Sequence, residues 1–104
     1  EGVYLEDLCF GAQQAAEKAI KAVLLHRGVE FPYVHDLARL LTLLEESGAD
    51  IPEDVRSAET LTPYAVITRY PTLFEPVTEE QYQEALELAE AVLRWARKQI
   101  GEES

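Results

Sequence analysis

Apolar side chains recur every three or four residues through the last quarter of the chain, and this spacing belongs to one face of an α-helix. The stripe consists of Tyr82, Ala85, Leu86, Ala89, Val92, Leu93, Ala96 and Ile100. Thr78 and Gln81 have the spacing of a capping box, so the helix should begin there and run to Gly101. Acidic residues come early and basic residues late on its outer face, which is the order that the helix dipole favours. The pattern predicts a long amphipathic helix, the clearest one in the chain.

A second long helix is predicted near the other end of the chain, from about Leu5 to Leu25. Its apolar residues at helical spacing are Leu5, Leu8, Cys9, Ala12, Ala15, Ala16, Ala19 and Val23. The polar residues on much of its other side are Gln13, Gln14, Glu17, Lys18 and Lys21. Glu17 and Lys21 form a favourable i, i+4 pair, and Gly28 is suited to end the helix. Cys9, the single cysteine, cannot form a disulfide within the chain, and we expect it to be a small buried hydrophobe.

Two shorter helices are expected between these two. Leucines at i, i+3, i+4 and i+7 predict a helix over about His35–Ser47, and Gly48 supplies the stop signal. Asp50 and Glu53 again have capping-box spacing. The next helix should therefore begin near Pro52, because a proline in the first turn removes no needed hydrogen bond.

Prolines set the limits of this third helix. Pro63 should kink or restart it, and Pro71 should end it at or just before Tyr70, because the residue before a proline avoids helical dihedral angles. The run AVIT at 65–68 has the propensity of a strand. No second strand is predicted that could pair with it, so we interpret it as part of the helix.

Four helices with short connections predict a single all-α domain over residues 1–104, an up-down antiparallel four-helix bundle. The sequence has no apolar run approaching the roughly 18 residues that span a bilayer. It also lacks the pattern of a secretory signal. These features predict a cytoplasmic protein that has no membrane partner.

The charge and the chemistry-bearing residues exclude several classes of function. The chain has 20 acidic and 9 basic residues, a formal net charge of −11, which repels a phosphate backbone and argues against sequence-independent DNA binding. Two histidines and one cysteine lack the spacing of a zinc site, and no glycine-rich loop is present to hold a dinucleotide or a nucleoside triphosphate. We expect no metal site and no cofactor, and any contact with nucleic acid should be local and specific.

Several motifs occur in the order found in one protein family. They are CFGAQQAAEK at 9–18, HDLARLL from His35, TRYP at 68–71 and the closing stretch EALELAEAVLRW. From Gly2 to Arg97 the sequence resembles the HEPN domains (higher eukaryotes and prokaryotes nucleotide-binding) of the prokaryotic single-domain type. The shared order makes the resemblance more specific than any one motif.

The resemblance implies a HEPN-type helical bundle that usually dimerises. Such proteins are often encoded beside a minimal nucleotidyltransferase and act in toxin-antitoxin or related defence systems. The family's usual extra N-terminal helix is missing from this sequence, so either the sequence is a fragment or a partner covers the exposed face. Gly11, Ala15, Ala19 and Ala22 lie near one line of the first helix and allow close helix approach. That line is either packed inside one bundle or forms a dimer seam.

Active members of the wider family are metal-independent endoribonucleases that use an arginine and a histidine with four to six residues between them. The histidine takes a proton from a ribose 2′-hydroxyl, and the arginine stabilises charge on the phosphate oxygens. Arg69 matches the arginine, but the histidine positions hold Phe74, Glu75 and Pro76. With the motif incomplete, ribonuclease activity is in doubt. His35 is a second candidate base, because a helix N-terminus favours the neutral imidazole; an ordinary hydrogen bond at the helix start is the other interpretation.

Two functions remain open. In the first, the protein binds nucleotides or RNA at a dimer cleft, where Arg69 holds a phosphate and Tyr64 and Tyr70 offer flat faces to a base. In the second, it is a non-catalytic dimeric module whose acidic bundle binds a partner protein. Arg69 would then reach solvent or pair with a nearby acid, and Tyr70 would fill the core with its hydroxyl at the surface.

Overall fold

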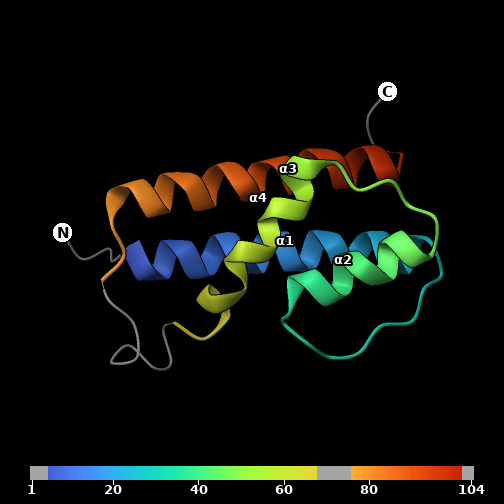
Figure 1. Ribbon diagram of the computed structural model, residues 1–104, viewed down its shortest axis with the longest axis horizontal. Helices are drawn as coiled ribbons and strands as arrows, with labels where there is room; N and C mark the ends of the chain where they lie inside the picture. Colours follow the sequence, from blue (N-terminus) through green and yellow to red (C-terminus); the bar gives the residue numbers. More distant parts are fainter. Residues whose placement is uncertain (1–4, 68–75, 102–104) are drawn as a thin grey trace.

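The computed structural model describes residues 5–67 and 76–101, and all regular structure in these two ranges is helical (Figure 1). The elements are α1 (Leu5–His26), α2 (Leu37–Glu46), α3 (Glu53–Arg56), the 3₁₀ helix η1 (Ser57–Ala65) and α4 (Glu79–Gln99). The long helices α1 and α4 lie side by side, α2 packs beside α1, and η1 contacts all four other helices. The all-α class and the four helices expected from the sequence are confirmed.

The up-down antiparallel order is wrong, because α1, α2 and α4 run in the same direction (Figure 1). At one end, Glu6 in the first turn of α1 accepts a hydrogen bond from the backbone N–H of Val77, just before α4, at 3.0 Å. At the other end, Arg27 after α1 donates to the carbonyl of Ser47 after α2, at 2.9 Å. The connection over residues 27–36 is long enough to reach back roughly 30 Å, about twice the length of α2. It therefore returns the chain to the starting end before α2 begins.

Most helix ends follow the local signals. Gly28 and Gly48 both have positive φ, +73° and +101°, as residues after a helix often do. The helix α2 begins slightly later than expected, because the side chain of Asp36 caps it by accepting from the N–H of Ala38 at 3.1 Å. The predicted capping box at the start of α4 is present, with both of its hydrogen bonds.

The third helix differs from its prediction. Pro52 occupies its N-cap without a side-chain hydrogen bond, so the expected Asp50 capping box is wrong. The α-helical part ends at Arg56, and the 3₁₀ continuation ends at Ala65 rather than near Tyr70. Pro63 has no N–H to donate within an α-helix, and its ring would crowd the carbonyl four residues earlier. The tighter 3₁₀ geometry begins before that proline, at Ser57.

The core lies where α2 and η1 pack against the α1–α4 pair. Its fully buried apolar side chains include Ile20, Val23, Leu24, Leu37, Leu40, Leu41, Leu44, Val55, Leu61 and Val92. Cys9 is buried among them, as predicted. Trp95 was not part of the apolar stripe expected for α4, yet it is 7% exposed and donates from Nε1 to the carbonyl of Asp50 at 3.2 Å.

Among the described residues, no helix combines the length and the apolar character needed to cross a lipid bilayer.

Candidate functional site

The structure places two of the four predicted site residues. Arg69 and Tyr70, with Phe74 and Glu75 of the incomplete motif, lie outside the described residues. His35 and Tyr64 are described, and they lie in separate clusters: His35 contacts α1, whereas Tyr64 faces α4. Each cluster includes a residue that the sequence did not single out as functional.

The first cluster is built around a buried carboxylate on α1. Gln13 is fully buried and Glu17 is only 5% exposed, although the helical pattern assigned both to the polar side. Oε1 of Glu17 accepts from Nε2 of Gln13 at 2.8 Å, and Oε2 accepts from Nζ of Lys21 at 2.7 Å. We call Gln13, Glu17, Lys21 and His35 the Glu17 cluster.

His35 joins this cluster from the connection between α1 and α2. Its Nδ1 lies 2.9 Å from Oε1 of Glu17. Because an ionised carboxylate only accepts hydrogen bonds, Nδ1 carries the proton, and in the neutral ring Nε2 is the acceptor. The His35 side chain is 52% exposed, so an oriented imidazole is held at the surface. The hydrogen bond anchors the start of α2 to the middle of α1.

The electrostatics of the cluster favour an ionised Glu17. Burial opposes the charge, but hydrogen bonds from Lys21, Gln13 and His35 outweigh it and hold the pKa of Glu17 below its ordinary value. The carboxylate is therefore charged at neutral pH, with the ammonium group of Lys21 on one oxygen. Lys21 also lies over the ring of Phe31, 5.9 Å from its centroid, which gives the connection a second contact with α1.

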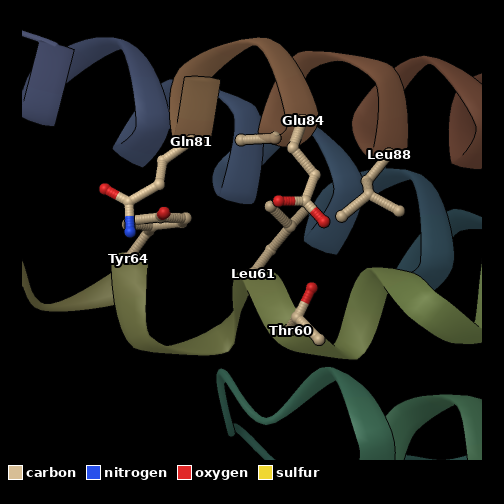
Figure 2. Close-up of a pocket in the computed structure, with 7 residues that line it drawn as sticks. Thr60, Leu61, Tyr64, Gln81, Glu84 and Leu88 are labelled. Atoms are coloured by element: carbon tan, nitrogen blue, oxygen red, sulfur yellow. The ribbon is translucent and has the colours of Figure 1, made fainter. Parts of the chain in front are cut away.

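The second cluster surrounds a notch of about 150 Å³ between η1 and α4 (Figure 2). Its lining consists of Thr60, Leu61 and Tyr64 from η1 and Gln81, Glu84, Ala85 and Leu88 from α4. Figure 2 shows the amide of Gln81 and the carboxylate of Glu84 reaching from α4 toward η1. We call this space the notch.

Tyr64 connects the notch to the core. Burial raises the pKa of its phenol, and the neighbouring Cys9 thiol and the negative charge of Glu84 raise it further. Burial also raises the pKa of Cys9, and the neighbouring Tyr64 phenol opposes this shift without cancelling it. Cys9 on α1 therefore lies close enough to the Tyr64 phenol to affect its pKa, while the Tyr64 side chain also lines the notch.

Comparison with protein families gives one result. The model of the HEPN domain matches residues 1–99. The chain belongs to the HEPN family. Neither the curated proteins nor the solved structures include a match to it. At the level of the family, HEPN function is related to nucleotides and RNA, and HEPN domains often dimerise.

In this HEPN domain a line of small and apolar residues on α1 remains at the surface, interrupted by the exposed Lys18. This α1 strip consists of Leu8, Gly11, Ala15, Ala22 and Leu25. Gly11 and Ala22 are exposed, and Leu25 is 69% exposed. A Cβ added to Gly11 would meet no atom within 4 Å. Tight packing inside one bundle is therefore not the role of Gly11 or Ala22.

Within residues 5–67 and 76–101 of this HEPN domain, no three histidine, cysteine, aspartate or glutamate side chains converge as ligands for a metal ion would.

Proposed function

We propose that this HEPN domain binds nucleotides or RNA, as a cytoplasmic component of a toxin-antitoxin or nucleotidyltransferase-linked system. The observation that supports the proposal is the family match, which spans residues 1–99 and so includes Arg69. In this proposal Arg69 holds a phosphate through charge-assisted hydrogen bonds. Tyr70 and Tyr64 supply aromatic surface for a base.

Binding without cleavage is the form of the proposal that the residues favour. The positions for the motif histidine hold Phe74, Glu75 and Pro76, and phenylalanine and proline side chains cannot accept a proton. A carboxylate at Glu75 could accept one but would repel the scissile phosphate. The Nδ1 of His35 is already committed to Glu17, and only its Nε2 is left to act as a base.

Replacing Arg69 by alanine should weaken RNA binding by about ten-fold, the loss expected for one charge-assisted contact to phosphate. Titration of a fluorescently labelled single-stranded RNA and of ATP, at fixed salt, measures the effect. Arg97→Ala removes the same charge from an exposed position on α4 and should bind like the native protein. Negligible and indistinguishable binding by native protein and Arg69→Ala would rule the proposal out.

We also propose that the domain forms a homodimer through the α1 strip. Small and apolar side chains exposed on one line of a helix allow a second helix to approach closely. A minimal nucleotidyltransferase is the partner protein proposed for the assembly.

The Gly11→Arg variant is therefore expected to be a folded monomer at concentrations where the native protein is a dimer. The space around Gly11 accepts a side chain within one subunit, so the loss should come from the interface alone. Size-exclusion chromatography with light scattering gives the mass, and circular dichroism checks the fold. Thr42→Arg adds the same charge to an exposed site on α2 and should remain dimeric. A native protein that is monomeric at high concentration would exclude the dimer.

A second candidate function is a non-catalytic module that binds a partner protein. It is favoured by the excess of 20 acidic over 9 basic residues and by the exposed glutamates on α4. Those glutamates are Glu79, Glu80, Glu84, Glu87 and Glu90. Such a surface attracts a basic partner and repels nucleic acid. The candidate predicts a stable complex with another protein under mild salt.

A further inference from the structure

We infer that the notch between η1 and α4 binds the guanidinium group of one arginine side chain from a basic partner protein. The inference rests on the second candidate function, for which it names the chemistry of the partner, and it is an alternative to the use of Tyr64 as a surface for a nucleotide base.

The charge of the lining selects a cation. Glu84 carries the one ionisable carboxylate among the lining residues, and no lysine, arginine or histidine contributes to the lining. Within the described residues Glu84 is exposed and forms no ion pair. A phosphate group would be repelled at this position, and the net charge of −11 adds to the repulsion.

The shape of the charged group selects a guanidinium over an ammonium. Two parallel N–H groups of a guanidinium match the two oxygens of a carboxylate, whereas an ammonium acts as a point charge. The hydroxyl oxygen of Thr60 offers a further acceptor, since its hydrogen is donated to the carbonyl of Ser57 at 3.0 Å. The five N–H donors of arginine can bind the carboxylate of Glu84 and the hydroxyl of Thr60 together.

The remaining walls suit the rest of an arginine side chain. The ring of Tyr64 provides an aromatic surface on which a guanidinium stacks favourably. Leu88 is half-buried and offers apolar contact to the methylene stem. Gln81 is held in place because its Oε1 accepts from the N–H of Thr78 at 2.9 Å, so this wall is fixed before the ligand arrives.

The size of the notch limits the occupant to one side chain. Its volume of about 150 Å³ is well below the roughly 300 Å³ at which pockets for small-molecule ligands begin. It opens on the surface beside the acidic residues of α4, which would attract the flanking part of a basic segment.

The test uses the ¹⁵N-labelled protein and the capped tripeptide acetyl-Gly-Arg-Gly-amide, followed by NMR chemical shifts. We expect saturable shifts at the amides of the notch lining, with affinity in about the millimolar range for so small an exposed contact. The same tripeptide with citrulline, which has nearly the same shape and no charge, should bind at least about five-fold more weakly, and so should the lysine tripeptide.

Matched variants assign the binding to the notch. Glu84→Gln should weaken binding of the arginine tripeptide by about five-fold, whereas Glu90→Gln should change its affinity by less than about two-fold. The two substitutions remove the same charge from the same helix, but a rotation of about 100° per residue puts position 90 on the side of α4 away from the notch. Both positions are exposed, so neither variant should affect folding.

Several results would overturn the inference: no shifts at the notch, equal binding of the citrulline tripeptide, or equal loss in both glutamate variants. Stronger shifts of the same amides by a single-stranded RNA would assign the notch to nucleic acid instead. If a partner protein is recovered with the native chain but the arginine tripeptide does not bind at the notch, only this inference is overturned. The second candidate function is then still supported.

Discussion

Replacing Trp95 by alanine should lower the free energy of unfolding by about 4 kcal/mol, the loss typical of a large buried aromatic side chain. Trp95 is 7% exposed, packs into the core from α4 and donates to the carbonyl of Asp50 in the turn before α3. The substitution opens a cavity between these elements and removes their hydrogen bond. A loss of this size is a large part of the roughly 5–15 kcal/mol that stabilises a typical domain. Urea unfolding followed by circular dichroism at 222 nm measures it.

Two further variants separate the causes of the Trp95 effect. Trp95→Phe keeps most of the apolar area but loses the donor, so it should cost about 1–2 kcal/mol and fold even where the alanine variant does not. Arg94→Ala changes the exposed residue next to Trp95, and its free energy of unfolding should be within about 0.5 kcal/mol of that of the native protein. An alanine variant as stable as Arg94→Ala would show that Trp95 does not hold α4 to the turn.

Replacing Glu17 by alanine should lower the free energy of unfolding by about 2–3 kcal/mol at neutral pH. Gln13 is fully buried and would lose the acceptor for its Nε2, while Lys21 and His35 would lose their shared partner. The start of α2 would also lose its anchor on α1. Hydrogen exchange should show faster exchange over residues 27–36 than in the native protein.

The contribution of Glu17 depends on pH in a defined direction. Its pKa is lower in the folded state than its ordinary value of 4.5, so as the pH falls the unfolded chain binds the proton first. The stabilisation is complete above about pH 5 and is lost as the pH falls through the folded pKa. The difference in stability between native protein and Glu17→Gln should therefore shrink as the pH falls below about 5.

Urea titrations at several pH values test this dependence. Glu46→Gln, at an exposed position on α2, should show no such convergence with the native protein. A difference between the native protein and Glu17→Gln that stays constant or grows on acidification would contradict the charged state assigned to the Glu17 cluster.

The helices could be predicted from the sequence because periodicity and capping residues are local signals. The relative direction of the helices could not be predicted from these signals. It depends on the path of the connection between two helices, whereas the apolar pattern shows only which face of each helix is buried. The 27–36 connection carries loop signals such as Pro32, but those signals do not say that it returns along the full length of α2.

Burial of Gln13 and Glu17 was missed although the sequence contained a signal for it. Ile20 and Leu24 are fully buried, and with Cys9 they place the centre of the apolar face close to position 13. A polar residue inside an apolar face indicates a hydrogen-bonded partner within the fold. The partner, His35, follows only from the tertiary contact between the connection and α1.

The candidate site was predicted only in part. Tyr64 was selected as a flat surface, but the notch beside it arises where η1 meets α4, and no local pattern brings Glu84 to Tyr64. The proposals for Arg69 and Tyr70 rest on the family match, because both residues lie outside the described part of the chain.

The 3₁₀ form of η1 makes the length of this segment unusually hard to change. A 3₁₀ helix rises about 2.0 Å per residue against 1.5 Å in an α-helix, so its nine residues reach roughly 18 Å across the bundle. Its three residues per turn place Ala58, Leu61 and Tyr64 in one row, and all three are buried or half-buried. One inserted residue would turn everything after it by about 120° and move Tyr64 away from α4. Insertions and deletions should therefore not be tolerated in η1.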